Sequence, residues 1–211
     1  MAYGDTWTWT AIEADSKLII SWLVGGRDGD YAMGLMDDLR SRVANRIQLT
    51  SDGHRAYLDA VEGAFGGDID YAMLVKLYGA ASDATKGRYS PAECTGIRKT
   101  RIEGDPDPKH VSTSYAERHN LNMRMQMRRF TRLTTGYSKK IENHSHMVFA
   151  LYTVWFNWIR THKAHRVTPA MAAGLTDKLM DMAEVSRLID DAEMRATIQG
   201  RAALLALPQS N

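Results

Sequence analysis

The sequence predicts a mixed α/β fold, and three patterns lead to this prediction. Two short runs rich in β-formers, at residues 7–12 and 18–24, flank a tight turn. A stretch with helical spacing of apolar residues follows, and short strands then alternate with helices up to residue 77. The order hairpin, helix, strand, helix, strand is typical of an α/β domain with a mixed sheet.

The first elements are a hairpin and a helix. Residues 14–17 form the predicted turn of the hairpin, and Gly25 and Gly26 end its second strand. Asp28 or Asp30 then caps a predicted helix that runs to about residue 45. Apolar residues recur in it at every fourth position, at Tyr31, Leu35, Leu39 and Val43.

A strand, a helix and another strand complete the predicted sheet. The strand at residues 47–50 runs into a turn at residues 51–54, and a helix follows through Phe65. Residues 69–77 are predicted to form the next strand. Residues 1–78 thus predict a partial sheet with its flanking helices.

The rest of the chain predicts a loop and further helices. Residues 79–111 carry Pro91, Pro106 and Pro108 with little periodicity, which indicates an irregular insertion loop. Residues 112–176 are expected to complete the domain with helices at about 112–134 and 138–162, with Leu121 and Met125 in the core. In the same region Thr168 and Pro169 favour the start of a short helix, and residues 177–211 predict a helical tail.

Composition limits the class of protein. The chain has 211 residues, 44% of them hydrophobic, which is enough for one substantial core. No apolar run approaches the roughly 20 residues of a membrane span, and no signal peptide is apparent. The single cysteine, Cys94, excludes an intrachain disulfide and fits a reducing compartment. We therefore expect a cytoplasmic protein without a membrane partner.

Positive charge gathers around one carboxylate, Glu117. Between residues 117 and 140 there are seven bases and this one acid, although the whole chain has 27 bases and 25 acids. Such a segment suits phosphate binding, and duplex nucleic acid is its natural counter-ion. A solvated surface is the alternative. The expected DNA-binding residues are Arg118, Arg124, Arg128, Arg129, Arg132, Lys139 and Lys140.

Two carboxylates are candidates for chemistry. Asp52 stands where a short strand ends and Gly53 turns the chain, a place where ligands gather in α/β sheets. Its alternative role is to cap the next helix. Glu117 lies in the first turn of a predicted helix, where its alternative role is to interact favourably with the helix dipole.

Six segments together resemble transposases of the insertion-sequence-one type, which belong to the DDE superfamily and have a ribonuclease H-like fold. The segments are GDTWTWTA at residues 4–11, TSDGH at 50–54, YAMLVKLYG at 71–79, SYAERHNL at 114–121, RRFTRLT at 128–134 and RVTPAM at 166–171. The resemblance implies DNA transposition, with two Mg²⁺ or Mn²⁺ ions held by three carboxylates. It implies that Asp52 is the second of these carboxylates and Glu117 the third.

The first carboxylate of that family has no counterpart in this sequence. In the family it belongs to a Cys-Asp-Glu-x-Trp type motif in the central strand of the sheet, ahead of the matching segments. We therefore expect an N-terminally truncated domain with two unpaired strand edges and little or no activity of its own. The alternatives are a non-enzymatic DNA-binding remnant, an inhibitor of a full-length transposase, and a nuclease of the same fold. The sequence does not decide whether the chain forms a homo-oligomer.

Overall fold

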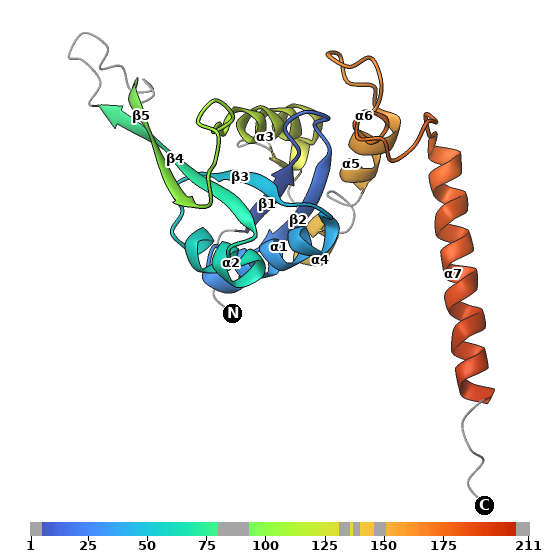
Figure 1. The fold of residues 1–211 in the computed structure, drawn as a ribbon. Coiled ribbons are helices and arrows are strands. Elements are labelled where there is room, and N and C mark those ends of the chain that lie inside the picture. Colours follow the sequence, from blue (N-terminus) through green and yellow to red (C-terminus); the bar gives the residue numbers. More distant parts are fainter. Residues whose placement is uncertain (1–5, 80–92, 131–135, 137–139, 146–150, 206–211) are drawn as a thin grey trace, which may run out of the picture. The chain divides into compact units, whose positions relative to one another are not determined.

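The computed structural model describes residues 6–79, 93–130, 136, 140–145 and 151–205, with the backbone alone for Glu93 and for residues 198–205. The chain divides into two compact units, Met1–Phe149 and Ala150–Asn211. The first unit holds all the described strands together with several helices (Figure 1). The predicted α/β class is therefore confirmed. No helix within the described residues is long and apolar enough to cross a membrane.

The hairpin and the first helix form as the sequence predicts. β1 (Trp7–Ile12) pairs antiparallel with β2 (Ile19–Gly25). α1 (Gly29–Arg42) begins after Asp28, whose Oδ1 accepts a hydrogen bond from the backbone N of Tyr31 at 3.3 Å. Leu35 and Leu39 are buried on its inner face. The local capping signal and the four-residue spacing are thus sufficient for this part of the fold.

A parallel pair of strands follows. β3 (Ile47–Ser51) leads into α2 (Ala56–Phe65), and β4 (Ile69–Gly79) then lies parallel to β3. Ile69 and Tyr71 of β4 point into the core, and both are about 1% exposed or less. The helix between the strands supplies the crossover that a parallel pair requires.

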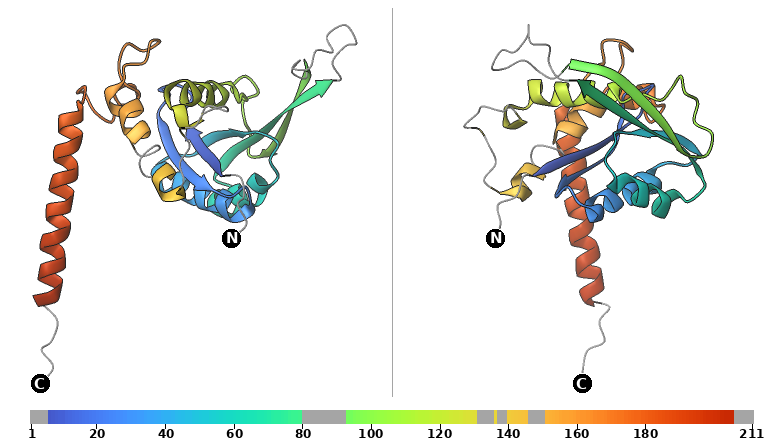
Figure 2. Two further views of the ribbon diagram at one scale, coloured as in Figure 1. Left: turned by 180° about the vertical axis from the view of Figure 1, so that it is seen from behind. Right: turned by 90° about the vertical axis from the view of Figure 1, so that its left-hand side faces the viewer.

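The strands form two sheets. β1 pairs with β2, whereas β3, β4 and β5 (Glu93–Glu103) form a second sheet in that order. No ladder joins β1 to β3 in the described part of the chain. Both sheets nevertheless pack on α1 and α2, in one core that includes Trp9 and Tyr71 (Figure 2). Within the described residues β1 and β3 are each paired on one side only, and the loss of a central strand between them stays a prediction.

The insertion at residues 79–111 differs from the expected irregular loop. Residues 93–103 form β5, which pairs antiparallel with β4 and shifts register at two places along the ladder. The sequence did not predict this strand, because much of it is exposed on both faces and its polar and apolar residues therefore do not alternate. Pairing with β4, rather than a local pattern, determines this strand.

The helix expected at 112–134 is shorter. α3 (Ser114–Gln126) ends where Met127 becomes extended, and Arg128–Phe130 form a 3₁₀ turn. Its buried side chains are His119 and Met123, one turn apart on a single face. Leu121 and Met125, which we expected in the core, are 43% and 76% exposed because they lie on other faces.

The remaining described elements are helical. In the first unit α4 is the short helix Ile141–Asn143. In the second unit α5 (Leu151–Val154) continues as the π-helix Trp155–Ile159, so the predicted helix at 138–162 is described only in these pieces. α6 (Pro169–Ala172) begins as predicted, with Thr168 Oγ1 accepting a hydrogen bond from the backbone N of Met171. α7 (Met182–Leu205) lies within the predicted tail.

Candidate functional site

Asp52 lies directly after β3, where the chain turns toward α2. Its Oδ1 accepts a hydrogen bond from the backbone N of His54 at 3.0 Å, and the side chain is exposed. The N-cap position of α2 is Arg55, so Asp52 stabilises the turn and does not cap the helix. A Cβ on Gly53 would meet Cγ2 of Val75 at 2.8 Å, so the glycine lets this turn approach β4 closely.

Aromatic side chains surround the Asp52 turn. The His54 ring lies 5.6 Å from the Trp9 ring and 5.9 Å from the Tyr57 ring, measured between centroids. Burial raises the pKa of Tyr71 to about 12, with a smaller contribution from the Asp52 charge. Burial and the same charge also raise the pKa of Tyr57. Both phenols therefore stay protonated beside the carboxylate at neutral pH.

Glu117 lies in the first turn of α3 and is held through both carboxylate oxygens. The ammonium of Lys76 donates to Oε2 at 2.5 Å, and the Thr113 hydroxyl donates to Oε1 at 2.8 Å. The hydrogen bond from Lys76 is the largest cause of the lowered pKa of Glu117, and the bond from Thr113 adds to it. The same contact raises the pKa of Lys76. Both groups are therefore charged at neutral pH.

Glu117 and the turn that carries Asp52 lie near consecutive residues of β4, whose side chains point to opposite faces of the strand. The Asp52 turn packs against Val75, and Glu117 binds Lys76, the next residue of β4. Among the described residues, however, no group of three or more His, Cys, Asp or Glu side chains could hold a metal ion. Both carboxylate oxygens of Glu117 also accept hydrogen bonds from the chain itself, one from the Lys76 ammonium and one from the Thr113 hydroxyl. The described residues therefore do not fit a two-ion centre by themselves.

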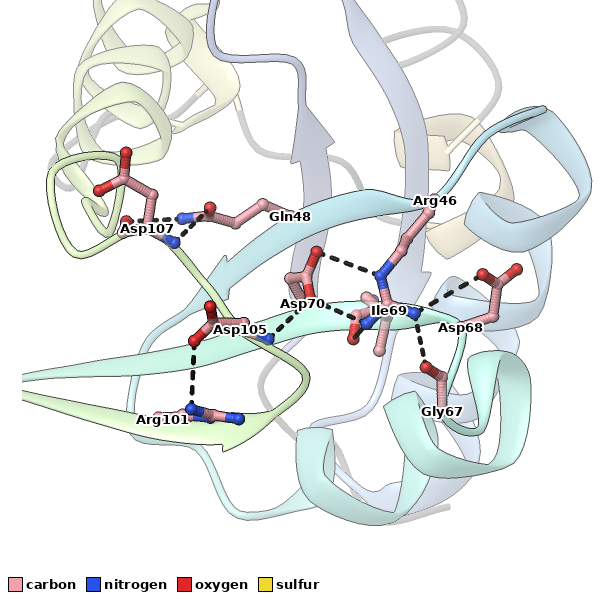
Figure 3. A network of polar contacts seen from close by, with 9 residues as sticks. All are labelled: Arg46, Gln48, Gly67, Asp68, Ile69, Asp70, Arg101, Asp105 and Asp107. Carbon is pink, nitrogen blue, oxygen red and sulfur yellow. Dashed lines mark hydrogen bonds and ion pairs between the residues drawn. The ribbon is translucent and has the colours of Figure 1, made fainter.

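A polar network fixes the segment between β5 and α3 that leads to Glu117 (Figure 3). Arg46 binds the Asp70 carboxylate at 2.8 Å and the carbonyl of Ile69 at 2.8 Å. Asp70 in turn accepts a hydrogen bond from the backbone N of Asp105 at 2.8 Å. These contacts, chiefly that from Arg46, lower the pKa of Asp70 to about 2.

Gln48 forms the second attachment of this segment. Its side-chain amide donates to the carbonyl of Asp107 at 3.0 Å and accepts from the backbone N of Asp107 at 2.9 Å (Figure 3). An apolar contact follows, because Val111 packs with Ala72 and Leu74 of β4. β3, β4 and this segment thus set the position at which α3 starts.

The predicted basic residues do not form one helical stripe. Arg118 and Arg124 are exposed on α3, whereas Arg128 and Arg129 are exposed in the 3₁₀ turn that follows. The four-residue spacing of Arg124, Arg128 and Arg132 in the sequence predicts one helical face, and this prediction is wrong because α3 ends before Arg128. Lys140 is exposed next to α4. Arg132 and Lys139 lie outside the described residues.

Sequence reasoning missed Lys76 and the cations of β5. Lys76 is the one charged residue between Tyr71 and Gly79 of β4, which was a usable signal for a specific partner. That the partner is Glu117 could not be predicted, because the two residues meet only through the fold. The exposed cations Arg98, Lys99 and Arg101 lie in the segment that we expected to be irregular.

Comparison of the chain with protein-family models, curated proteins and solved structures found no match.

Proposed function

We propose that this chain is a DDE-type transposase catalytic domain with a ribonuclease H-like fold, which acts on DNA in the cytoplasm. One observation carries the proposal. Gly53, the residue after Asp52, lies close to Val75 of β4, and Glu117 binds Lys76, the next residue of that strand. The exposed arginines Arg118 and Arg124 follow Glu117 on the same helix. This combination of acids beside phosphate-binding cations suits an enzyme that cuts a polyanion.

The residues of this chain supply DNA binding and two of the three expected carboxylates. The guanidinium groups of Arg118, Arg124 and Arg128 neutralise phosphates, and the released counter-ions make the affinity depend on salt. Divalent ions, when bound to a complete set of three carboxylates, supply the nucleophile activation of this reaction class. Because the described residues do not complete that set, we expect the chain alone to bind DNA without cutting it.

A second candidate function is a non-enzymatic DNA-binding protein that inhibits a full-length transposase. The pairing of Glu117 with Lys76 and Thr113 favours it, since both carboxylate oxygens are already engaged. An ion pair within the chain gives Glu117 a role that needs no metal. DNA binding is common to both candidates, whereas cleavage separates them.

Fluorescence anisotropy with a 30-base-pair duplex, at several salt concentrations, tests DNA binding. We expect log K to fall linearly with log salt, and the double variant R118Q/R124Q to lower the slope by about two. R195Q is the matched control, because Arg195 is an exposed arginine on α7. No detectable binding by the unaltered chain at low salt would refute both candidate functions.

A plasmid-nicking assay with Mg²⁺ or Mn²⁺ tests cleavage. We expect no nicking by the unaltered chain, as its described carboxylates do not complete a metal centre. Nicking that disappears in Glu117→Gln would show that the residues present suffice, and would favour the enzyme over the inhibitor.

A further inference from the structure

β4 and β5 continue beyond the rest of their sheet as a two-stranded ribbon. β3 pairs with β4 only from Ile69 to Met73, whereas the β4–β5 ladder extends from Tyr71 to Gly79. From Leu74 onward β4 therefore has β5 as its ladder partner and no other described strand. Figures 1 and 2 show the two strands projecting past the end of β3. We call residues 74–79 and 93–99 the distal ribbon.

The distal ribbon carries cations on both of its faces. Arg98 is opposite Val75 and Lys99 is opposite Leu74, so these two neighbouring side chains point to opposite faces. Lys99 donates to the carbonyl of Pro108 at 2.6 Å, which leaves further donors on its ammonium. Lys76 shares a face with Lys99 and reaches Glu117. No acidic residue lies at 74–79 or 94–99, and Glu93 stands at the far end.

Large apolar side chains are exposed on the distal ribbon, next to these cations and farther out along the two strands. Tyr78 is 60% exposed, Ile97 is 56% exposed and Leu77 is 45% exposed. A two-stranded ribbon has little stability of its own, so apolar side chains left in water on it indicate a surface that is covered in use. Cations beside them, with Glu93 as the one acid of the distal ribbon, indicate that the covering partner is a polyanion with apolar edges.

Duplex DNA meets these requirements. Its major groove is wide enough to admit a two-stranded β-ribbon, phosphates line both sides of the groove, and base edges with thymine methyl groups form its floor. A ribbon with a cation on each face can contact both phosphate rows at once. The exposed apolar side chains on the face that is turned to the groove floor then lie against the bases.

We propose that the distal ribbon enters the major groove of duplex DNA, as a second DNA contact besides Arg118 and Arg124. The proposal rests on the proposed function, which supplies DNA as the partner. Because Lys76 joins the ribbon to Glu117, DNA held by the ribbon also runs past this carboxylate. The ribbon thereby sets the direction in which the duplex crosses the candidate site.

The test is the salt dependence of duplex binding by ribbon variants, measured by fluorescence anisotropy. The double variant R98Q/K99Q should bind a 30-base-pair duplex about ten-fold more weakly, with a log–log salt slope smaller by about two. The charge-conserving variant R98K/K99R should retain the slope, and circular dichroism should show that both variants are folded. R195Q serves as the control for loss of a surface charge elsewhere.

The possible binding results distinguish a failure of the proposed function from a failure of the ribbon proposal. If the unaltered chain does not bind duplex DNA, the proposed function fails and the ribbon loses its partner. If it binds, and R118Q/R124Q weakens binding while R98Q/K99Q does not, the ribbon proposal alone is overturned. A change in self-association in Y78S/I97S, with unchanged DNA binding in R98Q/K99Q, would assign the ribbon to a protein partner instead.

Competition tests the choice of groove. Methyl green, which occupies the major groove, should compete with the unaltered chain for the duplex. A ligand of the minor groove should leave unchanged the difference in DNA affinity between the unaltered chain and R98Q/K99Q. The opposite pattern would overturn the major-groove assignment.

Discussion

Lys76 and Glu117 join β4 to α3 through an ion pair of 2.5 Å. Both side chains are partly exposed, at 34% and 47%, so the pair lies at the surface within reach of salt and ligands. It engages one of the two residues that the resemblance assigns to metal binding. The cation that Glu117 meets in this structure is thus a lysine of its own chain.

Removing the lysine should raise the pKa of Glu117. The pKa is lowered from its ordinary value of 4.5, and the hydrogen bond from Lys76 is the largest cause. The pair therefore stabilises the fold above pH 4.5, and this contribution is lost as the pH falls through the lowered value. In Lys76→Met, a carboxyl-carbon NMR titration should show a pKa closer to 4.5. Thr113→Val should give a smaller rise, and an unchanged pKa in Lys76→Met would contradict the assignment.

Buried His119 should make the fold sensitive to acid. Burial lowers its pKa from 6.5 to about 4, and the side chain is 1% exposed. Below pH 6.5 His119 becomes protonated in the unfolded chain but stays neutral in the folded chain. The free energy of unfolding therefore falls between about pH 6.5 and pH 4. The loss should reach about 3 kcal/mol by pH 4. Urea unfolding across this range measures it.

His119→Gln is the matched variant for this prediction. It should be less stable at pH 7.5, because a buried ring is lost. Its unfolding free energy should nevertheless lack the fall between pH 6.5 and pH 4 that His119 causes. If the unfolding free energy falls equally steeply with pH in His119→Gln and in the unaltered chain, the acid sensitivity belongs to other groups.

Gly104 should tolerate no side chain. Its φ is +63°, and a Cβ there would lie 2.2 Å from Oδ1 of Asp70 and 2.4 Å from the carbonyl oxygen of Ile69. Gly104→Ala should therefore destabilise the fold by more than the roughly 1 kcal/mol expected from a positive φ alone. Gly66→Ala is the control, since Gly66 has φ +53° with open space around it. Similar unfolding free energies for the two variants would refute the steric argument.

The open edges of β1 and β3 should be visible in hydrogen exchange. Each strand has a ladder on one side only within the described residues, so its remaining amides lack a strand partner. We expect these amides to exchange faster than those of β4 between Tyr71 and Met73, where both neighbours are paired. Limited proteolysis and size-exclusion chromatography should show cleavage near these edges and self-association. A protease-resistant monomer with uniformly slow exchange would contradict the prediction.

Much of the fold could be predicted where the signal is local. The hairpin, α1, β3, α2 and β4 were predicted because caps, turns and apolar periods lie within each segment. β5 and the end of α3 were missed. β5 depends on a ladder to a strand far back in the chain, and α3 buries only His119 and Met123, which is too narrow a stripe to mark its end.

The sequence by itself determined the α/β class and marked Asp52, Glu117 and the arginines after it as candidates. Only the tertiary structure decided what these residues meet. It placed Lys76 against Glu117, divided the strands into two sheets and exposed the distal ribbon with Arg98 and Lys99. The reason is physical: periodicity and capping act over a few neighbouring residues, whereas ion pairs and strand ladders join residues that only chain folding brings together.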